Sequence, residues 1–179
     1  IKISKKFKLK IIEDAAESIG SFYKNKHTGT FADLGVISFN GNKTITTGSG
    51  GAIIINKSKY SKIIKHIGST AKLPHKWEYI HDKIGYNYRM AAINAAIGRA
   101  QLNKIEVLIK KKRSLFLRYK KNLQDINELN LVEEPIHSRS NYWLNTIILD
   151  ENIKKKERDV ILKLLNESKI YARPIWKPL

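Results

Sequence analysis

The segment Ile11–Gly51 decides the fold class of this chain. It reads IIEDAAESIGSFYKNKHTGTFADLGVISFNGNKTITTGSGG. An apolar run ends in an acidic residue at Asp14, Ser38 precedes Lys43 by five residues, and a Gly-rich turn follows over 48–51. In open α/β sheets, ligands bind at the carboxyl ends of the strands. The pattern therefore predicts an α/β fold with a ligand site at one edge of its sheet.

These residue types suit a cofactor that carries a phosphate, a basic ring nitrogen and an aldehyde, which describes pyridoxal phosphate. Asp14 would pair with the ring nitrogen, the Ser38 hydroxyl would bond to the phosphate, and the Lys43 amine would condense with the aldehyde. Asp14 also suits the N-cap of a helix, and Glu17 could complete a capping box with it. The residues alone leave both interpretations open.

At these positions the chain resembles the DegT/DnrJ/EryC1/StrS family of pyridoxal-phosphate-dependent nucleotide-sugar aminotransferases. The motifs that carry the resemblance are EDAAES (13–18), HTGTF (27–31), SFNGNK (38–43), TTGSGG (46–51), GYNYRM (85–90) and YARPIWKPL (171–179). Glu17 stands where many members have Gln, and Ser49 stands where many have Glu or Gly.

The resemblance implies an α/β, fold-type I aminotransferase in which Lys43 forms the Schiff base and moves the proton. The residues carried over as cofactor contacts are Asp14, Ala16, Glu17, Ser38, Lys43 and Asn87. The residues carried over as substrate contacts are Arg89, Arg173 and Trp176. In the family the equivalent of Asn87 reaches the partner's cofactor phosphate, so a homodimer with shared active sites is expected.

The implied reaction moves an amino group from glutamate to a keto-sugar of a nucleoside diphosphate, for surface glycan biosynthesis. The segment 75–82, HKWEYIHD, resembles members that act on UDP-linked deoxy-amino sugars. A UDP-linked 4-keto-6-deoxy sugar is therefore the expected substrate. Two alternatives stay open, which are an inactive fragment of such an enzyme and a basic nucleic-acid-binding domain.

The resemblance covers nearly the whole chain, although members of the family are longer. The only methionine is Met90, so no initiator methionine is present. We expect an internal fragment that holds the later part of the large domain and the start of the small one. The expected division is a cofactor-binding part over 1–103, a bridging helix over 104–124 and part of the small C-terminal domain over 125–179.

Composition excludes several other classes of protein. The net charge of +18 would favour a polyanionic partner, but the lysines are scattered, as on solvated helix faces, so no specific nucleic-acid partner is expected. The absence of cysteine excludes disulfides and thiolate metal sites, and the spacing of His75 and His81 is too irregular to indicate a metal site. Apolar runs such as 53–55 are too short to span a membrane, so a cytoplasmic enzyme is expected.

Periodicity predicts the individual elements. The expected strands are Phe7–Ile12, Val36–Phe39, Ala52–Ile55 and Tyr142–Leu149. The expected helices are Ser58–His66 with Ser58 as its N-cap, Ala91–Leu102, Asn103–Leu123 and Lys156–Ser168. A long ordered loop is expected over Lys72–Tyr88, an irregular segment over Asn127–Ser140 and an extended tail around Pro174 and Pro178.

Overall fold

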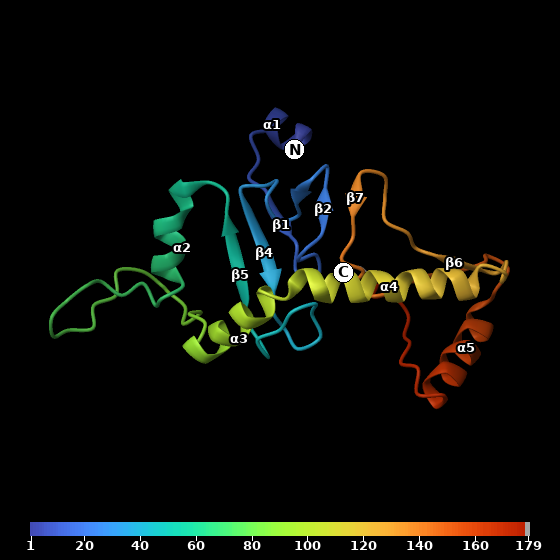
Figure 1. Ribbon diagram of the computed structural model, residues 1–179. Helices are drawn as coiled ribbons and strands as arrows, with labels where there is room; N and C mark the ends of the chain where they lie inside the picture. The colour runs from blue at the N-terminus through green and yellow to red at the C-terminus, as the bar shows by residue number, and fades with distance from the viewer. Residues whose placement is uncertain (178–179) are drawn as a thin grey trace. The chain divides into compact units, whose positions relative to one another are not determined.

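The computed structural model describes residues 1–177 and divides into two compact units (Figure 1). The first unit holds Ile1–Leu115 together with Glu134–Trp143. The second holds Phe116–Glu133 and the chain from Leu144 onward. Pro178 and Leu179, which end the last sequence motif, lie outside the described residues. The domain boundaries expected near residues 103 and 124 stay a prediction.

The helices are α1 (Lys2–Lys6), the short 3₁₀ helix η1 (Ser58–Tyr60), α2 (Ser61–Ile67), α3 (Ala92–Leu102), α4 (Ile105–Leu123) and α5 (Lys155–Glu167). The strands are β1 (Ile12–Asp14), β2 (Phe22–Tyr23), β3 (Lys26–His27), β4 (Leu34–Ser38), β5 (Gly51–Ile55), β6 (Leu129–Leu131), β7 (Ser138–Arg139) and β8 (Ile147–Leu149).

The central sheet of the first unit has the strand order β1-β4-β5 (Figure 1). Strand β1 pairs with β4 in parallel, with Ile12 opposite Leu34 and Asp14 opposite Val36. Strand β5 pairs with β4 in the antiparallel sense over all five residues of each strand. Because β1 and β4 are parallel, their carboxyl ends lie at the same edge of the sheet, and both continue there into turns.

Two smaller sheets complete the strand pairing. Strands β2 and β3 form a hairpin, and β7 adds to the free edge of β2, with Phe22 opposite Arg139. This pairing brings Ser138–Arg139 into the first unit although these residues lie more than a hundred positions along the chain from β2. In the second unit β6 pairs with β8 in the antiparallel sense.

The central sheet packs closely against the turn that precedes β4. Gly29 has a φ of +87°, a conformation that glycine adopts without the steric cost of a Cβ. A Cβ added to Gly35 in β4 would overlap the backbone of Gly29, so the two chain segments approach as closely as their backbones allow. The side chains of Ala15 and Ile37, both buried, lie beside the same turn.

Most predicted elements are confirmed within one or two residues. These are the strands at 36–39 and 52–55, the helices at 91–102, 103–123 and 156–168, and the loop over 72–88, which contains no helix or strand. The helix expected at Ser58–His66 is present from Ser61, but Ser58 is not its cap, because η1 precedes it and begins after Lys57.

The strand predicted at Phe7–Ile12 is wrong in its position. Residues Lys2–Lys6 form α1, and pairing with β4 begins only at Ile12. At Ile11 the backbone N–H donates to Asp33 Oδ2 (2.9 Å). The Asp33 side chain therefore takes the place of a backbone partner for the Ile11 N–H, and β1 begins at Ile12.

The strand predicted at Tyr142–Leu149 is too long, because only Ile147–Leu149 is β-structure. The chain turns at Tyr142, which has a φ of +46°, and Asn141 Oδ1 accepts a hydrogen bond from the Trp143 backbone N–H (2.9 Å). This local bond competes with strand pairing. The irregular segment expected at Asn127–Ser140 is likewise incorrect in part, since it contains β6 and β7.

We predict that Gly35→Ala lowers the free energy of unfolding by about 1–3 kcal/mol, because the added methyl group must displace the Gly29 backbone. The measurement is urea unfolding followed by tryptophan fluorescence. Gly41→Ala is the matched control, since the nearest atom to its added Cβ, Gly48 O, is 3.9 Å away. Equal losses in the two variants would contradict the close approach.

Candidate functional site

The candidate site begins with two residues that end neighbouring parallel strands. Asp14 is the last residue of β1, and Ser38 is the last residue of β4. Lys43 follows in the connection between β4 and β5. The structure thus brings the three residues to the same edge of the sheet, in the arrangement that the carboxyl ends of parallel strands provide for ligands.

Asp14 starts a turn and not a helix. Its Oδ1 accepts a hydrogen bond from the Ala16 backbone N–H (3.1 Å), and the Ala15 N–H donates to Val36 O (3.0 Å). Residues 15–21 contain no helix, so the helix-cap interpretation of Asp14 and the capping-box interpretation of Glu17 are both wrong. The Asp14 side chain is exposed at the end of the sheet, where its carboxylate can meet a ligand.

The connection from Ser38 to Gly51 is closed by its own backbone. Phe39 N–H donates to Gly50 O (2.9 Å), and Phe39 O accepts from Thr47 N–H (3.0 Å). Inside this closed loop, Lys43 N–H donates to Asn40 O (3.0 Å), which forms a tight turn. The Cα of Lys43 is therefore fixed close to the end of β4.

The Lys43 side chain extends between an acid and an aromatic ring. Its Nζ forms an ion pair with Glu17 Oε1 and lies 4.3 Å from the centroid of the Trp143 ring. The Lys43 side chain is only 11% exposed, whereas that of Glu17 is 47% exposed. The amine is thus held at a defined place between Glu17 and Trp143.

Trp143 and Asn141 are part of this site and were not predicted from the sequence. Trp143 Nε1–H donates to Asn42 O (2.6 Å), next to Lys43 in the chain. Asn141 is buried, and its Nδ2–H₂ group donates to Glu17 O (2.8 Å) and Ile19 O (3.0 Å). The segment around residues 141–143 therefore binds both the turn that carries Glu17 and the loop that carries Lys43.

This segment is anchored by two basic residues of α4. The Arg113 guanidinium makes two hydrogen bonds of 2.8 Å to the Glu134 carboxylate and a third to Ser140 O. Glu134 Oε2 also accepts from the Ser140 backbone N–H (2.7 Å). Hydrogen bonding to Arg113 lowers the pKa of the Glu134 carboxyl below its ordinary value, although partial burial opposes the shift.

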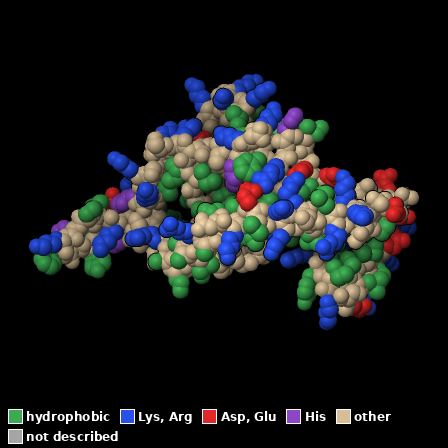
Figure 2. Space-filling view, viewed as in Figure 1, with side chains coloured by type: hydrophobic (Ala, Val, Ile, Leu, Met, Phe, Trp, Pro, Cys, Tyr) green, Lys and Arg blue, Asp and Glu red, His purple; other side chains and the backbone are tan. Residues whose placement is uncertain are grey.

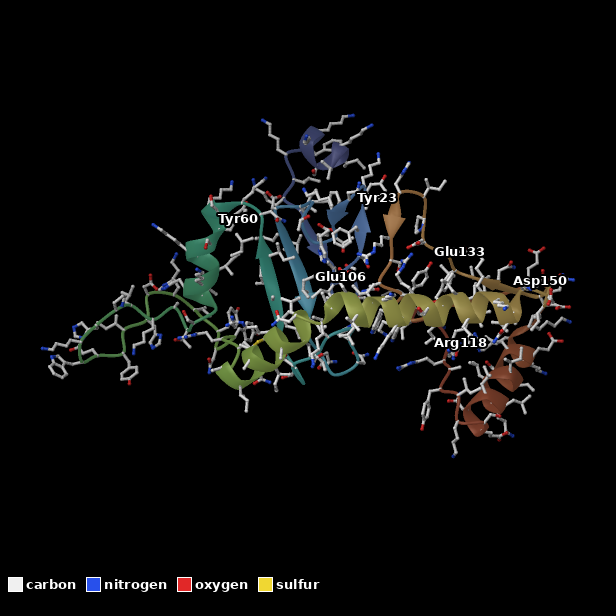
Figure 3. All side chains as sticks on the ribbon, viewed as in Figure 1. Tyr23, Tyr60, Glu106, Arg118, Glu133 and Asp150 are labelled. Carbon is white, nitrogen blue, oxygen red and sulfur yellow. The ribbon has the colours of Figure 1, made fainter. Side chains whose placement is uncertain are left out.

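Lys112 and Arg139 add to this anchoring. Lys112 Nζ donates to Trp143 O (3.1 Å), and its burial lowers the pKa of the Lys112 amine. Arg139 forms an ion pair (2.8 Å) with Glu106, which lies near the start of α4 and is labelled in Figure 3. The hydrogen bond from Arg139 lowers the pKa of Glu106. The segment 134–143 is consequently tied to α4 at both its ends.

Helix α3 supports the loop on the other side of Lys43. Gln101 makes paired hydrogen bonds to the backbone of Thr46, at 3.0 Å to its N–H and 2.8 Å to its carbonyl. Asn94 Nδ2–H donates to Thr47 O (2.6 Å). Neither Asn94 nor Gln101 could be predicted as a site residue, because a polar residue on an Ala-rich helix is ordinarily solvated.

The HTGTF motif holds the turn after β1, and among the described residues no hydrogen bond or ion pair joins it to Lys43. Glu13 Oε1 and Oε2 accept from the N–H groups of Gly29 (2.5 Å) and Phe31 (2.9 Å). Thr28 Oγ1–H is within hydrogen-bonding distance of Ser18 Oγ (2.8 Å). The motif therefore fixes the segment 13–18, on which Asp14 and Glu17 are carried.

Asn87 and Arg89 lie in the connection from α2 to α3, and both are exposed. Asn87 forms an isolated bridge with Ser69, and the rings of Tyr86 and Tyr88 on either side of it are stacked at 5.1 Å. Within residues 1–177, no hydrogen bond or ion pair joins Asn87 or Arg89 to Asp14, Ser38 or Lys43. Their predicted roles stay predictions.

Arg173 and Trp176 belong to the second unit. The Arg173 guanidinium carbon lies 5.7 Å from the centroid of the Trp176 ring, within the range of a cation–π contact. Both residues are exposed in the extended tail after α5. Their predicted part in substrate binding stays a prediction.

Three further findings concern partners. Figure 2 shows Lys and Arg side chains over α1, α2 and α4 alike, so the basic residues on this face do not gather over one element. Among residues 1–177, no group of three or more His, Asp or Glu side chains is placed to hold a metal ion. In the same described part of the chain, no helix is both long and apolar enough to cross a membrane.

Residues 1–179 match the DegT/DnrJ/EryC1/StrS aminotransferase family. The chain is 41% identical to EpsN of Bacillus subtilis (strain 168), over 94% of this chain and 42% of EpsN. It is 38% identical to GDP-perosamine synthase of Escherichia coli O157:H7, over 100% of this chain and 48% of that protein. The chain thus spans about half the length of these relatives.

The structural comparison agrees with the sequence comparison. Helicobacter pylori PseC, an aminotransferase involved in the biosynthesis of pseudoaminic acid, matches with a TM-score of 0.92 and 30% identity, over 99% of this chain and 48% of PseC. The α/β aminotransferase fold predicted from the sequence is confirmed.

We predict that Glu134→Gln weakens the fold in a pH-dependent way. The pKa of Glu134 is lowered, so its bond to Arg113 stabilises the protein above the ordinary pKa of 4.5, and this contribution is lost as pH falls through the lower folded pKa. At neutral pH we expect a loss of about 1–2 kcal/mol in the free energy of unfolding, as for a hydrogen bond to a charged group in a partly exposed pair.

Glu133→Gln is the control for this prediction. Glu133, labelled in Figure 3, pairs with Lys120 (2.7 Å), and both side chains are about half exposed. An exposed pair of this kind contributes about 0–1 kcal/mol. Urea unfolding at several pH values measures both variants. A Glu134→Gln loss that is unchanged at low pH would contradict the assignment.

Proposed function

The chain belongs to the DegT/DnrJ/EryC1/StrS aminotransferase family, and from this premise we propose that it carries the lysine-bearing part of a pyridoxal-phosphate-dependent aminotransferase. The proposed acceptor is a keto-sugar of a nucleoside diphosphate. The observation that carries the proposal is the position of Lys43, whose amine lies beside Glu17 in a loop at the sheet edge where Asp14 and Ser38 end their strands.

The donor set at this edge fits pyridoxal phosphate. Asp14 offers an exposed carboxylate for a protonated ring nitrogen, Ser38 offers a hydroxyl for a phosphate oxygen, and Lys43 offers a primary amine for the aldehyde. When bound, pyridoxal phosphate would carry the amino group and accept electrons from the carbon that loses a proton. Ala16 and Glu17 belong to the turn after Asp14 and would line the same cofactor.

In this proposal Lys43 holds and moves the proton of the reaction. The Lys43 side chain is only 11% exposed and its Nζ is paired with Glu17, so the amine is held in one place. The ion pair with Glu17 keeps the Lys43 amine at the sheet edge. The hydrogen bond from Asn141 to Glu17 O fixes the backbone from which that carboxylate extends.

The substrate class rests on the relatives. One similar protein is named GDP-perosamine synthase, and PseC takes part in the biosynthesis of pseudoaminic acid, so we propose a nucleotide-linked keto-sugar as acceptor for surface glycan biosynthesis. We retain glutamate as the amino donor and a UDP-linked 4-keto-6-deoxy sugar as the first acceptor to test. A GDP-linked sugar is the second, because of the 38% identity to the synthase.

The remaining contacts complete the proposal. We propose Arg89, Arg173 and Trp176 as substrate contacts, since guanidinium groups suit phosphate oxygens and an aromatic ring can pack on a sugar or base. Asn87 would contact the cofactor phosphate of a partner copy in a homodimer. We propose a cytoplasmic location for the reaction, where nucleotide sugars are made.

We predict that pyridoxal phosphate bound to the protein is fixed to Lys43 by borohydride reduction. Peptide mapping by mass spectrometry should find the label on Lys43 in the unaltered protein and in Lys59→Ala, whose lysine is exposed beside Tyr60 (Figure 3). Lys43→Ala should lose the label, because the variant lacks the amine that lies beside Glu17 at the sheet edge. A label on another lysine of the unaltered protein would contradict the assignment.

A second prediction concerns the reaction itself. The protein, loaded with pyridoxal phosphate and given glutamate, should convert a 4-keto sugar linked to UDP or GDP into the amino sugar, with release of 2-oxoglutarate. Lys43→Ala should reduce kcat by at least about a hundredfold, as expected when a general acid–base group is removed. Absence of turnover with every UDP- and GDP-linked 4-keto sugar tested would favour the alternative that the chain is an inactive fragment.

A further inference from the structure

Trp143 is the aromatic residue nearest to the Lys43 amine, and its ring, its indole N–H and its backbone all make contacts. The ring faces Lys43 Nζ at 4.3 Å, the indole N–H donates to Asn42 O, and the backbone carbonyl accepts from Lys112 Nζ. Its backbone N–H also donates to Asn141 Oδ1. Every one of these partners lies in the first unit.

We infer that Trp143 is a positioning residue that holds the Lys43 amine against Glu17 with the face of its indole ring. The inference rests on the proposed role of Lys43 and adds a residue from a distant part of the chain to that site. No sequence motif includes this tryptophan.

The geometry suits an attraction between the ammonium group and the ring. A cation within about 6 Å of the ring centroid is attracted by the negative face of the π-system, and the attraction increases when water is excluded. The 4.3 Å distance and the 11% exposure of the Lys43 side chain meet both conditions.

A second lysine–tryptophan contact in the chain provides a comparison. Lys76 Nζ lies 4.7 Å from the centroid of the Trp77 ring, a similar distance, but Trp77 is 77% exposed. Solvent screens that contact, so it exerts little control over the Lys76 amine. The two pairs differ mainly in burial, which makes Trp77 a matched control.

The indole ring is itself fixed, which is why it can position another group. Its N–H donates a hydrogen bond to the backbone carbonyl of Asn42, the residue before Lys43, so the ring is fixed to the same loop as the lysine. Asn141 fixes the backbone of Trp143 and, through Glu17 O, the turn that carries the carboxylate. The acid, the amine and the ring are thus joined by one hydrogen-bonded network.

The positioning matters for a proton transfer, because a lysine side chain has four rotatable bonds and many accessible positions. Proton transfer to a particular atom is faster when the other conformations of the donating side chain are excluded before the reaction. Loss of the ring should therefore affect the chemical step more than the binding of substrate.

The first test measures the reactivity of lysine amines in the cofactor-free protein. Trace acetylation with acetic anhydride, followed by mass spectrometry, gives the rate at Lys43 relative to other lysines. Trp143→Leu should raise the Lys43 rate about three- to tenfold, the range expected from loss of a partly buried cation–π contact. Trp143→Phe keeps an aromatic face and should raise it less than about threefold.

Trp77→Leu should leave the Lys43 rate unchanged. Unaltered rates at Lys59 and Lys120, with an unaltered circular dichroism spectrum, show that a variant is folded. An unchanged Lys43 rate in folded Trp143→Leu overturns the inference. Equal increases in the Leu and Phe variants also overturn it, because they would assign the effect to the indole N–H and not to the ring face.

The second test separates kcat from KM in the cofactor-loaded protein. Trp143→Leu should lower kcat about tenfold or more while KM for the nucleotide sugar changes less than about threefold, with partial recovery in Trp143→Phe. A change confined to KM overturns the positioning role. If no nucleotide sugar is converted, the proposed function fails, whereas the acetylation test still decides the role of Trp143.

Discussion

The parallel pairing of β1 with β4 is the constraint on which the rest of the first unit depends. It places the ends of both strands at one edge, so that Asp14 and Ser38 face the same space and the Lys43 loop leaves from the same side. The close approach of Gly29 and Gly35 and the two bonds from Glu13 to the turn over 29–31 fix the chain that connects the two strands. The packing of the connecting chain thereby determines where the sheet edge that could hold a ligand lies.

The second constraint comes from far along the chain. Segment 134–143 belongs to the first unit, whereas the residues before and after it belong to the second. It is bound within the first unit through β7, Arg113 and Asn141. It closes the site with an indole ring and a buried amide. The charged anchor between Arg113 and Glu134 makes this closure sensitive to acid, because protonation of the carboxylate removes the charge that the guanidinium binds.

Much of the fold could be predicted because helix and strand periodicity is local. The helices from 91 to 123 and the strands around 36 and 53 follow directly from apolar spacing. Two strands are mispredicted where a side chain replaces or interrupts a ladder. Asp33 binds the backbone of Ile11, just before β1 begins, and Asn141 turns the chain before β8; neither bond is visible in a pattern of apolar residues.

By itself, the sequence determined the family, the α/β class and the order Asp14, Ser38, Lys43, because these depend on residue identities at short, ordered spacings. Only the tertiary structure decided that Glu17 meets the Lys43 amine rather than capping a helix, and that Trp143, Asn141, Asn94 and Gln101 hold the surrounding loops. These contacts join residues that are 26 to 124 positions apart. Hydrogen bonds and ring contacts over such separations depend on how the chain returns to itself, and local propensity carries no information about that return.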